Sequence, residues 1–393
     1  MNPYDFVPID MQHPPERRKP IWHNVLKNTD THAGKLYSGH FYVNIKTETP
    51  LFIPNTNTYT LDPRYPYPEY AKEHICNNAG QYIIPGMSLK GLLRSVVETL
   101  CNGCMRVFQI PKGYTKDALP AEFNACRDNK NLCLACRLFG MMPENKKNAQ
   151  VYLGKVNIGD ALVYGDTLSF HESAYTAILE APKPRHLAFY LDPAKRYIAG
   201  RKFYFHHHGR LSTTDDLIEI PGKLQDTDDK SKKFRNQYIQ PLATGTTLAA
   251  RIDFTNLEAD EFAALLLAIT LKPDMRHKIG YGKPIGLGSI HMNLTKLCLV
   301  DYTTRYTALH SGRGISQYNT SEVTNLVTEQ MATFDKQIQA DWLYFSKQPS
   351  LQHLHNIWKW PPDSSVVYSY PSQHWFKEHS QARIADTVDL YPE

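Results

Sequence analysis

The middle of the chain alternates between two spacings of apolar residues. From His40 to Lys46 every second residue is apolar, which predicts a β-strand with one buried face. From Leu89 to Leu100 apolar residues recur at every third or fourth position, which predicts an amphipathic α-helix. We expect this helix to begin at Ser88, because a serine hydroxyl can accept a free backbone N–H at a helix start.

The same spacings recur later in the chain, in the order of a complete fold. Strand patterns cover residues 154–160, 247–254 and 289–300, and an apolar helical pattern follows Asn256, which we expect to be the helix cap. The order strand, helix, strand, strand, helix, strand is that of a ferredoxin-like domain. We therefore predict an α+β fold with a ferredoxin-like core.

Composition divides the chain into three parts. Residues 1–37 are polar and proline-rich, which predicts an arm with little structure of its own. Residues 38–304 hold the ferredoxin-like domain, interrupted by a cysteine-rich insertion at 101–140 and a long charged insertion at 171–243. Residues 305–393 hold a predicted helix and a tail rich in Trp and Tyr, which we expect to be an appendage that packs on this chain or on a neighbour.

Charge and hydropathy limit the classes of partner. The net charge of +5 permits a nucleic-acid partner but does not require one, so local clusters of cations have to decide. The longest apolar run, residues 262–269, is too short to cross a bilayer, and the N-terminus lacks the pattern of a secretory signal. We expect a cytoplasmic protein without membrane contact. Disulfides are rare in that compartment, so the seven cysteines need another explanation.

Five of the cysteines lie close together in the sequence, with two C-x-x-C steps among them: Cys101, Cys104, Cys126, Cys133 and Cys136. Two paired thiolates on each side of a loop can hold a tetrahedral zinc ion, which needs four ligands. Five candidates compete for those four positions, and Cys101 could instead be a core residue in register with the apolar helix face. We predict a structural zinc site, and the alternative is a set of reduced thiols without metal.

A glycine-rich loop near the end of the domain contains Gly280, Gly282, Gly286 and Gly288. Glycine allows the backbone to approach a ligand closely, and successive free N–H groups form a concavity that binds anions. Three cations lie in or beside this loop, namely Arg276, Lys278 and Lys283. We therefore predict phosphate binding here, although the spacing fits neither a dinucleotide fingerprint nor a P-loop. The alternative is a glycine-rich hairpin with charges nearby.

Two further pairs of cations are candidates for an anionic ligand. Lys90 and Arg94 lie four residues apart on the polar side of the first predicted helix. Arg201 and Lys202 begin a strand-like segment that ends in three histidines, residues 206–208. For Lys90 and Arg94 the alternative is a pair of solvated charges on an ordinary amphipathic helix.

Four segments together resemble the RAMP superfamily of CRISPR-associated proteins, in particular the backbone subunits of type III effector complexes. They are the segment 84–95, the segment Cys133-Leu-Ala-Cys-Arg-Leu-Phe-Gly140, the segment 200–208 and the glycine loop at 280–288. The resemblance covers about residues 38–300. It implies an RNA-recognition-like core that binds CRISPR guide RNA beside other effector subunits, with the 171–243 insertion as a thumb.

The resemblance also implies roles for particular residues. Ser88, Lys90 and Arg94 would contact guide phosphates, and the glycine loop would lie against the RNA backbone. Main-chain donors and cations suit contacts that are independent of sequence. Arg201 and Lys202 would form a second RNA contact.

Some members of the family cut complementary target RNA with an acidic residue between the first strand and the first helix. Here that loop offers Asp62, Glu69 and Glu73, which could hold magnesium or manganese. Two other functions stay open. One is a standalone endoribonuclease that processes precursor CRISPR RNA with histidines, and the other is a zinc-stabilised scaffold that binds proteins through its aromatic tail.

Overall fold

The structure, a computed structural model of the chain, describes residues 1–23, 35–55, 71–106, 118–143, 150–176, 179, 186–192, 194, 197–208, 211–212, 238–307, 314–319, 335–371 and 373–387. Three long antiparallel strands form its centre: β3 (Tyr37–Thr47), β15 (Thr247–Leu257) and β17 (Ser289–Val300). These strands confirm the predictions at 40–46, 247–254 and 289–300.

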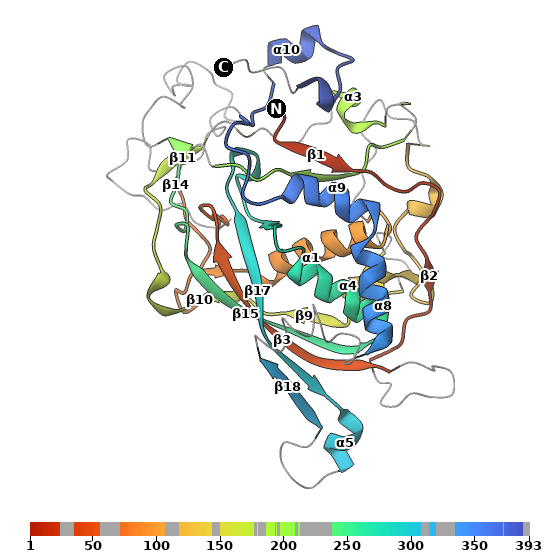
Figure 1. Cartoon of the computed structure of the whole chain (residues 1–393). Coiled ribbons are helices and arrows are strands. Elements are labelled where there is room, and N and C mark those ends of the chain that lie inside the picture. Colours follow the sequence, from red (N-terminus) through yellow and green to blue (C-terminus); the bar gives the residue numbers. More distant parts are fainter. Residues whose placement is uncertain are drawn as a thin grey trace.

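Shorter strands extend these three into a curled antiparallel sheet (Figure 1). The strand order is β16–β17–β3–β15–β10–β5, with β18 paired to β17 and β9 paired to β15. The bounds are β16 His277–Lys278, β10 Ala161–Val163, β5 Ile83–Ile84, β18 Ile315–Asn319 and β9 Val156–Ile158.

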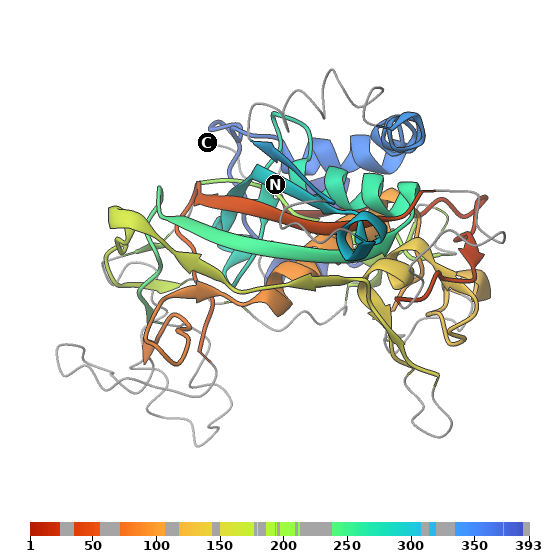
Figure 2. The same cartoon turned by 90° about the horizontal axis from the view of Figure 1, so that it is seen from below.

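Alternation along β3 divides the sheet into two faces. Phe41, Val43 and Ile45 are fully buried in the main core, whereas Tyr42 and Lys46, at the alternate positions, are exposed. Successive residues of a strand point to opposite faces, so the apolar set faces the helices and the polar set faces outward. Figure 2 looks onto the outer face, with β3 in orange-red and β15 in green running across the front.

Helices α1 (Gly86–Leu100) and α4 (Ala259–Thr270) cover the inner face of the sheet (Figure 1). The helix predicted from Leu89 to Leu100 is confirmed, but its start at Ser88 was wrong. The helix begins two residues earlier, where the carboxylate of Asp160 accepts the N–H of Gly86 at 2.7 Å. A carboxylate from another part of the chain therefore serves where a local serine hydroxyl was expected.

The start of α4 also differs from the prediction. Glu258 is its cap, and Glu258 and Glu261 form a reciprocal capping box. Asn256 instead has a left-handed backbone with φ of 53°, and its N–H donates to the hydroxyl of Ser38 at 2.9 Å.

The N-terminal segment is more structured than its composition predicted. β1 (Tyr4–Val7) pairs with β12 (Arg201–Tyr204), and β2 (Arg17–Arg18) pairs with β6 (Leu132–Cys133). Tyr4 and Val7 are buried. The expectation of an arm with little structure was therefore wrong for these residues, because β1 supplies apolar residues to the fold.

Helices α8 (Lys336–Ser346) and α9 (Pro349–Trp358) complete the helical layer (Figure 1). Phe345 and Trp358 are buried in the same core cluster as the apolar residues of α1 and α4. This part of the C-terminal segment therefore packs on the chain's own domain.

The remaining elements are short. The helices are α2 Leu134–Phe139, α3 Leu187–Tyr190, α5 Tyr302–Thr307 and α10 Gln373–Glu378, and the strands are β4 Ala71–Lys72, β7 Gly140–Met141, β8 Tyr152–Leu153, β11 Ala174–Thr176, β13 Leu211–Ser212 and β14 Tyr238–Ile239. Much of the expected thumb at 171–243 lies outside the described residues. Among the helices described, none combines the length and apolar character needed to cross a membrane.

Candidate metal centre and nucleic-acid interface

Four cysteines converge beyond the end of α1. Cys104 follows that helix, Cys126 lies in the next loop, Cys133 ends β6, and Cys136 lies in the first turn of α2. All four are buried, and their sulfur atoms lie within 4.8 Å of one another.

The spacing of these sulfurs fits a tetrahedral metal ion. Zinc–sulfur bonds of about 2.3 Å place the sulfurs of a tetrahedral site about 3.8 Å apart. The Sγ atom of Cys104 lies 3.6 Å from that of Cys136 and 3.7 Å from that of Cys133. The cluster could therefore bind a metal such as zinc. Four sulfur ligands leave no open position for water, so such an ion would stabilise the fold rather than catalyse a reaction.

Cys101, the fifth candidate, lies outside the cluster. It is the C-terminal cap of α1 and packs, partly buried, against the main core. The turn through Asn102 and Gly103 carries the chain from the helix to Cys104, the first cysteine of the cluster. The inclusion of Cys101 among the metal ligands was therefore wrong, and the alternative prediction, that Cys101 is a core residue, is confirmed.

Hydrogen bonds among the four thiols shift their pKa values, and two donors from the surrounding protein reach the sulfur atoms. Hydrogen bonds shared with Cys104, Cys126 and Cys136 lower the pKa of Cys133, whereas those that Cys136 shares with the other three cysteines raise its pKa. Four thiolates so close together cannot all ionise without a cation among them. The backbone N–H of Cys133 donates to the Sγ atom of Cys126 at 3.4 Å, and Nη2 of Arg94 donates to that of Cys136 at 3.2 Å.

Two predicted RNA-binding arginines therefore meet beside the metal centre. Arg94 pairs with Glu98 at 2.7 Å and donates to the carbonyl of Gly140 at 2.9 Å. Arg201 pairs with the same glutamate at 3.3 Å and donates to the carbonyl of Gly103. The side chains of the two arginines are only 11% and 10% exposed, so most of their donors serve the fold.

Lys90 and Arg106 differ from the other cations near α1, because neither makes an ion pair within the described part of the chain. Both are half-buried. Burial lowers the pKa of Lys90, and the nearby charges of Arg94 and Arg106 lower it further. Arg106 was not among the residues predicted to bind RNA. Its position two residues after Cys104 is the signal that could have identified it. Ser88 lies two residues before Lys90 on α1 and is half-buried.

The glycine loop does not offer the open row of N–H groups that its sequence predicted. The N–H groups of Tyr281 and Gly288 donate to the carbonyls of Phe52 and Pro50, at 2.8 and 2.9 Å. Those of Ile285, Gly286 and Leu287 donate to carbonyls within the loop.

The glycines instead permit tight packing of backbone against backbone. A Cβ atom at Gly288 would lie 1.8 Å from the carbonyl oxygen of Ile279, and one at Gly280 would lie 2.6 Å from that of Phe52. Gly282 and Gly286 have left-handed backbones, with φ of 73° and 94°, that glycine adopts without strain. The anion-binding concavity was therefore a wrong interpretation of these N–H groups.

The cations of this loop also have partners inside the protein. Lys278 is buried, and its Nζ atom donates to the carbonyl of Gly286 and the hydroxyl of Ser289, both at 3.0 Å. Burial holds the pKa of Lys278 well below its usual value, and nearby Lys283 lowers it further. Lys283 donates to the carbonyl of Gly280 at 2.7 Å.

Arg276 and Lys202, the other two cations predicted to bind RNA, also have partners within the protein. Arg276 pairs with Glu48 at 3.2 Å, and the Nζ atom of Lys202 lies 3.5 Å from the ring centre of Tyr4. His206, four residues after Lys202, is buried, and its ring bonds to the hydroxyl of Ser289 at 2.8 Å.

Of the three predicted acidic residues, the structure describes Glu73. Asp62 and Glu69 lie outside the described residues. Glu73 is exposed, and its backbone carbonyl accepts the N–H of Asn55 at 2.9 Å.

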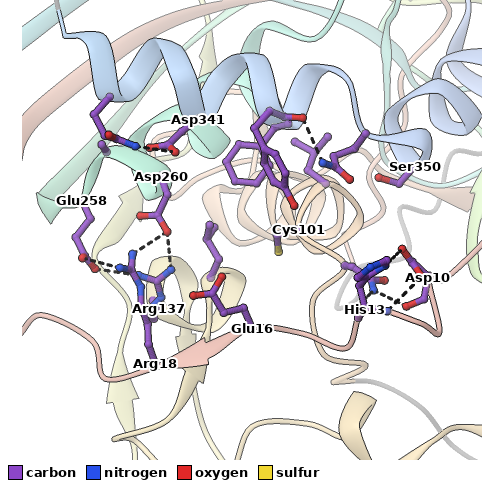
Figure 3. Close-up of a pocket in the computed structure, with 18 of the residues that line it drawn as sticks. Asp10, His13, Glu16, Arg18, Cys101, Arg137, Glu258, Asp260, Asp341 and Ser350 are labelled. Atoms are coloured by element: carbon purple, nitrogen blue, oxygen red, sulfur yellow. Dashed lines mark hydrogen bonds and ion pairs between the residues drawn. The ribbon is translucent and has the colours of Figure 1, made fainter.

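A pocket of about 1220 Å³ opens between the N-terminal segment, α1, α4 and α8. Figure 3 shows Arg18 and Arg137 pointing toward Asp260 in its wall. Arg137 pairs with Asp260 at 2.8 Å and Arg18 with the same carboxylate at 2.7 Å. Because both arginines are neutralised by carboxylates, this pocket is not suited to a phosphate.

Comparison with known proteins places the chain in a family. A search of curated proteins found no match. Among solved structures, a chain of a structure titled "Type IV-B CRISPR Complex" is similar, with 18% sequence identity and a TM-score of 0.33. The similarity covers 65% of this chain and 90% of that chain. The family model of the RAMP superfamily matches residues 44–291, which is more than half of the sequence. The chain belongs to the RAMP superfamily.

Proposed function

We propose that the chain is a guide-RNA-binding subunit of a CRISPR effector ribonucleoprotein, of the type III kind that the sequence resembles. Its partners would be the guide RNA, complementary target RNA and other effector subunits. Family membership supports this role. The strand order β17–β3–β15–β10, with α1 and α4 as the connecting helices, supports a ferredoxin-like core.

One observation carries the RNA contact. Lys90 and Arg106 are near enough for the charge of one to affect the other, and neither has a carboxylate partner among the described residues. Keeping two like charges together without a counter-charge costs stability, unless an anion neutralises them. The phosphates of an RNA backbone meet that need without any reading of sequence. Arg94 and the metal centre would then position α1 rather than contact RNA.

The test compares two double variants with the same change in charge. Lys90→Ala with Arg106→Ala should weaken binding of the full chain to a labelled single-stranded guide RNA. Loss of two phosphate contacts should also flatten the slope of log affinity against log salt by about 1.4. The control is Lys336→Ala with Lys347→Ala, two exposed lysines of the α8 region that should have little effect. Equal affinities of both double variants would contradict the proposal.

Cleavage of paired target RNA is a further proposal, and it depends on the loop that holds Asp62, Glu69 and Glu73. Labelled target RNA, annealed to bound guide, should be cut only when magnesium or manganese is added, and less by the variant that lacks the acting carboxylate. Processing of precursor RNA by histidine gains no support from His206 or His207, whose rings bond to the backbone carbonyls of Arg276 and Pro284.

A further inference from the structure

The outer face of the main sheet carries an aromatic ring between two cations. The strand register places Tyr42 of β3 directly opposite Arg251 of β15 and Lys296 of β17. Residues directly opposite in an antiparallel sheet project from the same face, with their Cβ atoms about 5 Å apart. Lys296, Tyr42 and Arg251 therefore form one row across three strands.

The neighbouring rows are mostly polar, although Leu162 of β10, which lies opposite Ala249, is also exposed there. Asn44 lies opposite Asn293 and Ala249, and Lys46 lies opposite His291. Lys46 and Asn293 are exposed. The surface beside Tyr42 therefore carries short amide side chains, which can form hydrogen bonds, and positive charge.

Tyr42 is open to solvent on this face. Its side chain is 38% exposed, while Phe41 and Val43 on either side are fully buried beneath the helices. The guanidinium of Arg251 lies 6.0 Å from the ring centre of Tyr42 and is half exposed. One carboxylate, that of Asp253, pairs with Arg251 at 2.6 Å, which leaves Lys46 and Lys296 as the cations without an ion pair among the described residues of this face.

This combination matches the chemistry of single-stranded nucleic acid. Exposed aromatic rings on a sheet stack with unpaired bases, and flanking cations contact the phosphates. Asparagine side chains can bond to base edges or sugars. A protein partner would be expected to meet a larger apolar surface than one tyrosine and one leucine among amides and cations.

We propose that the outer face of the sheet binds a stretch of single-stranded RNA, with one base stacked on Tyr42. The inference depends on the proposed function and extends it, because Lys90 lies on α1 and Arg106 lies in the segment that follows α1, on the helical side of the sheet. Tyr42 alternates along β3 with Phe41 and Val43, which belong to the same core cluster as the apolar residues of α1, so this second surface is separate from α1. An RNA bound at both surfaces would have to pass around an edge of the sheet.

The test uses the full chain and a fluorescent single-stranded RNA of about 16 nucleotides, the upper range of a site on one small domain. Tyr42→Ala should weaken affinity about 10-fold, the effect typical of losing one stacked base. Tyr42→Phe should keep wild-type affinity, because its ring still stacks. Tyr344→Ala, which removes a 63% exposed tyrosine on α8, should also keep it.

A second readout does not depend on the alanine variant folding. RNA that carries 5-iodouridine should photocrosslink to the tryptic peptide that contains Tyr42 in the wild-type chain. Crosslinks found only in other peptides, or equal affinity of Tyr42→Ala and wild type, would overturn the inference.

These outcomes separate the inference from the function on which it rests. If the wild-type chain binds no RNA, the proposed function itself fails. If Lys90→Ala with Arg106→Ala weakens binding and Tyr42→Ala does not, only the role of the sheet face fails. If Tyr42→Ala changes the mass in solution by light scattering and leaves RNA affinity intact, a second copy of the chain covers this face and the inference is wrong.

Discussion

The guanidinium of Arg94 joins helix α1 to the cysteine cluster. It reaches the Sγ atom of Cys136, the carboxylate of Glu98 and the carbonyl of Gly140 at once. A zinc ion with four thiolates carries two net negative charges, and a buried cation beside it offsets part of that charge. We therefore propose that Arg94 serves the cysteine cluster rather than a phosphate.

Replacing Arg94 should therefore weaken metal binding. We expect Arg94→Met to lower zinc affinity by about 10- to 100-fold, the usual effect of removing a partner of a ligand. Competition with a coloured zinc chelator measures this affinity. Lys130→Ala, which removes an exposed cation from the loop between Cys126 and Cys133, is the matched control. Equal zinc retention by the two variants would contradict the role assigned to Arg94.

At the scale of elements, the burial of α8 and α9 shows whether this part of the C-terminal segment belongs to the domain core or is a separate appendage. Phe345 of α8 is 4% exposed and Trp358 at the end of α9 is 1% exposed. Both belong to the core that α1 and α4 build. A tail that merely rested on the domain would not contribute such fully buried rings.

Two adjacent residues of α8 test this packing. Phe345→Ala should lower the free energy of unfolding by about 3–5 kcal/mol, through lost burial and the cavity that remains. Tyr344→Ala, at a 63% exposed neighbour, should change it by less than about 0.5 kcal/mol. Urea denaturation measures both. A similar small effect at both positions would mean that α8 does not form part of the cooperative core.

The elements that the sequence predicted well are those with a regular apolar spacing. That spacing predicted β3, α1, α4 and β17, because each of these elements buries one continuous face in the same core. Helix starts were predicted less well, since the caps of α1 and α4 depend on carboxylates and on contacts made only after folding.

The candidate site was harder to predict, because a residue type does not reveal its partner. The cysteine spacing predicted four ligands, and only the path of the chain after α1 excluded Cys101. The glycines at 280–288 predicted close approach of the backbone, but the approaching group is the protein's own chain around Phe52. Tyr42 has the alternation of any strand residue, and only the strand register shows its neighbours.

At the scale of the whole molecule, the core contains buried neutral histidines that bond to backbone carbonyls of nearby segments. The ring of His74 bonds to the carbonyl of Ile83 at 3.0 Å, and that of His277 bonds to the carbonyl of Ala268 at 2.8 Å. Burial lowers the pKa of each to about 4 from the usual 6.5. Both rings are therefore neutral in the folded protein at neutral pH.

Acid should therefore destabilise the fold. The unfolded chain takes up these protons as the pH falls below about 6.5, while the folded chain does so only near 4, so stability is lost between these values. Between pH 7 and pH 5 each histidine should cost about 2 kcal/mol. Urea denaturation should show a smaller loss for His277→Gln than for wild type. His13→Gln, at an 80% exposed ring, should behave as wild type, and a loss unchanged in His277→Gln would contradict this assignment.

Helix α1 is anchored at both ends, by Asp160 at Gly86 and by Arg94 and Glu98 beside the cysteines. A helix held in this way can neither rotate nor slide when it meets a ligand. Lys90, between the two anchors, therefore has a fixed position relative to the rest of the chain. A flexible polymer that binds there must adjust its own path to the protein, so that the protein acts as a rigid template and the polymer bears the entropic cost of being shaped.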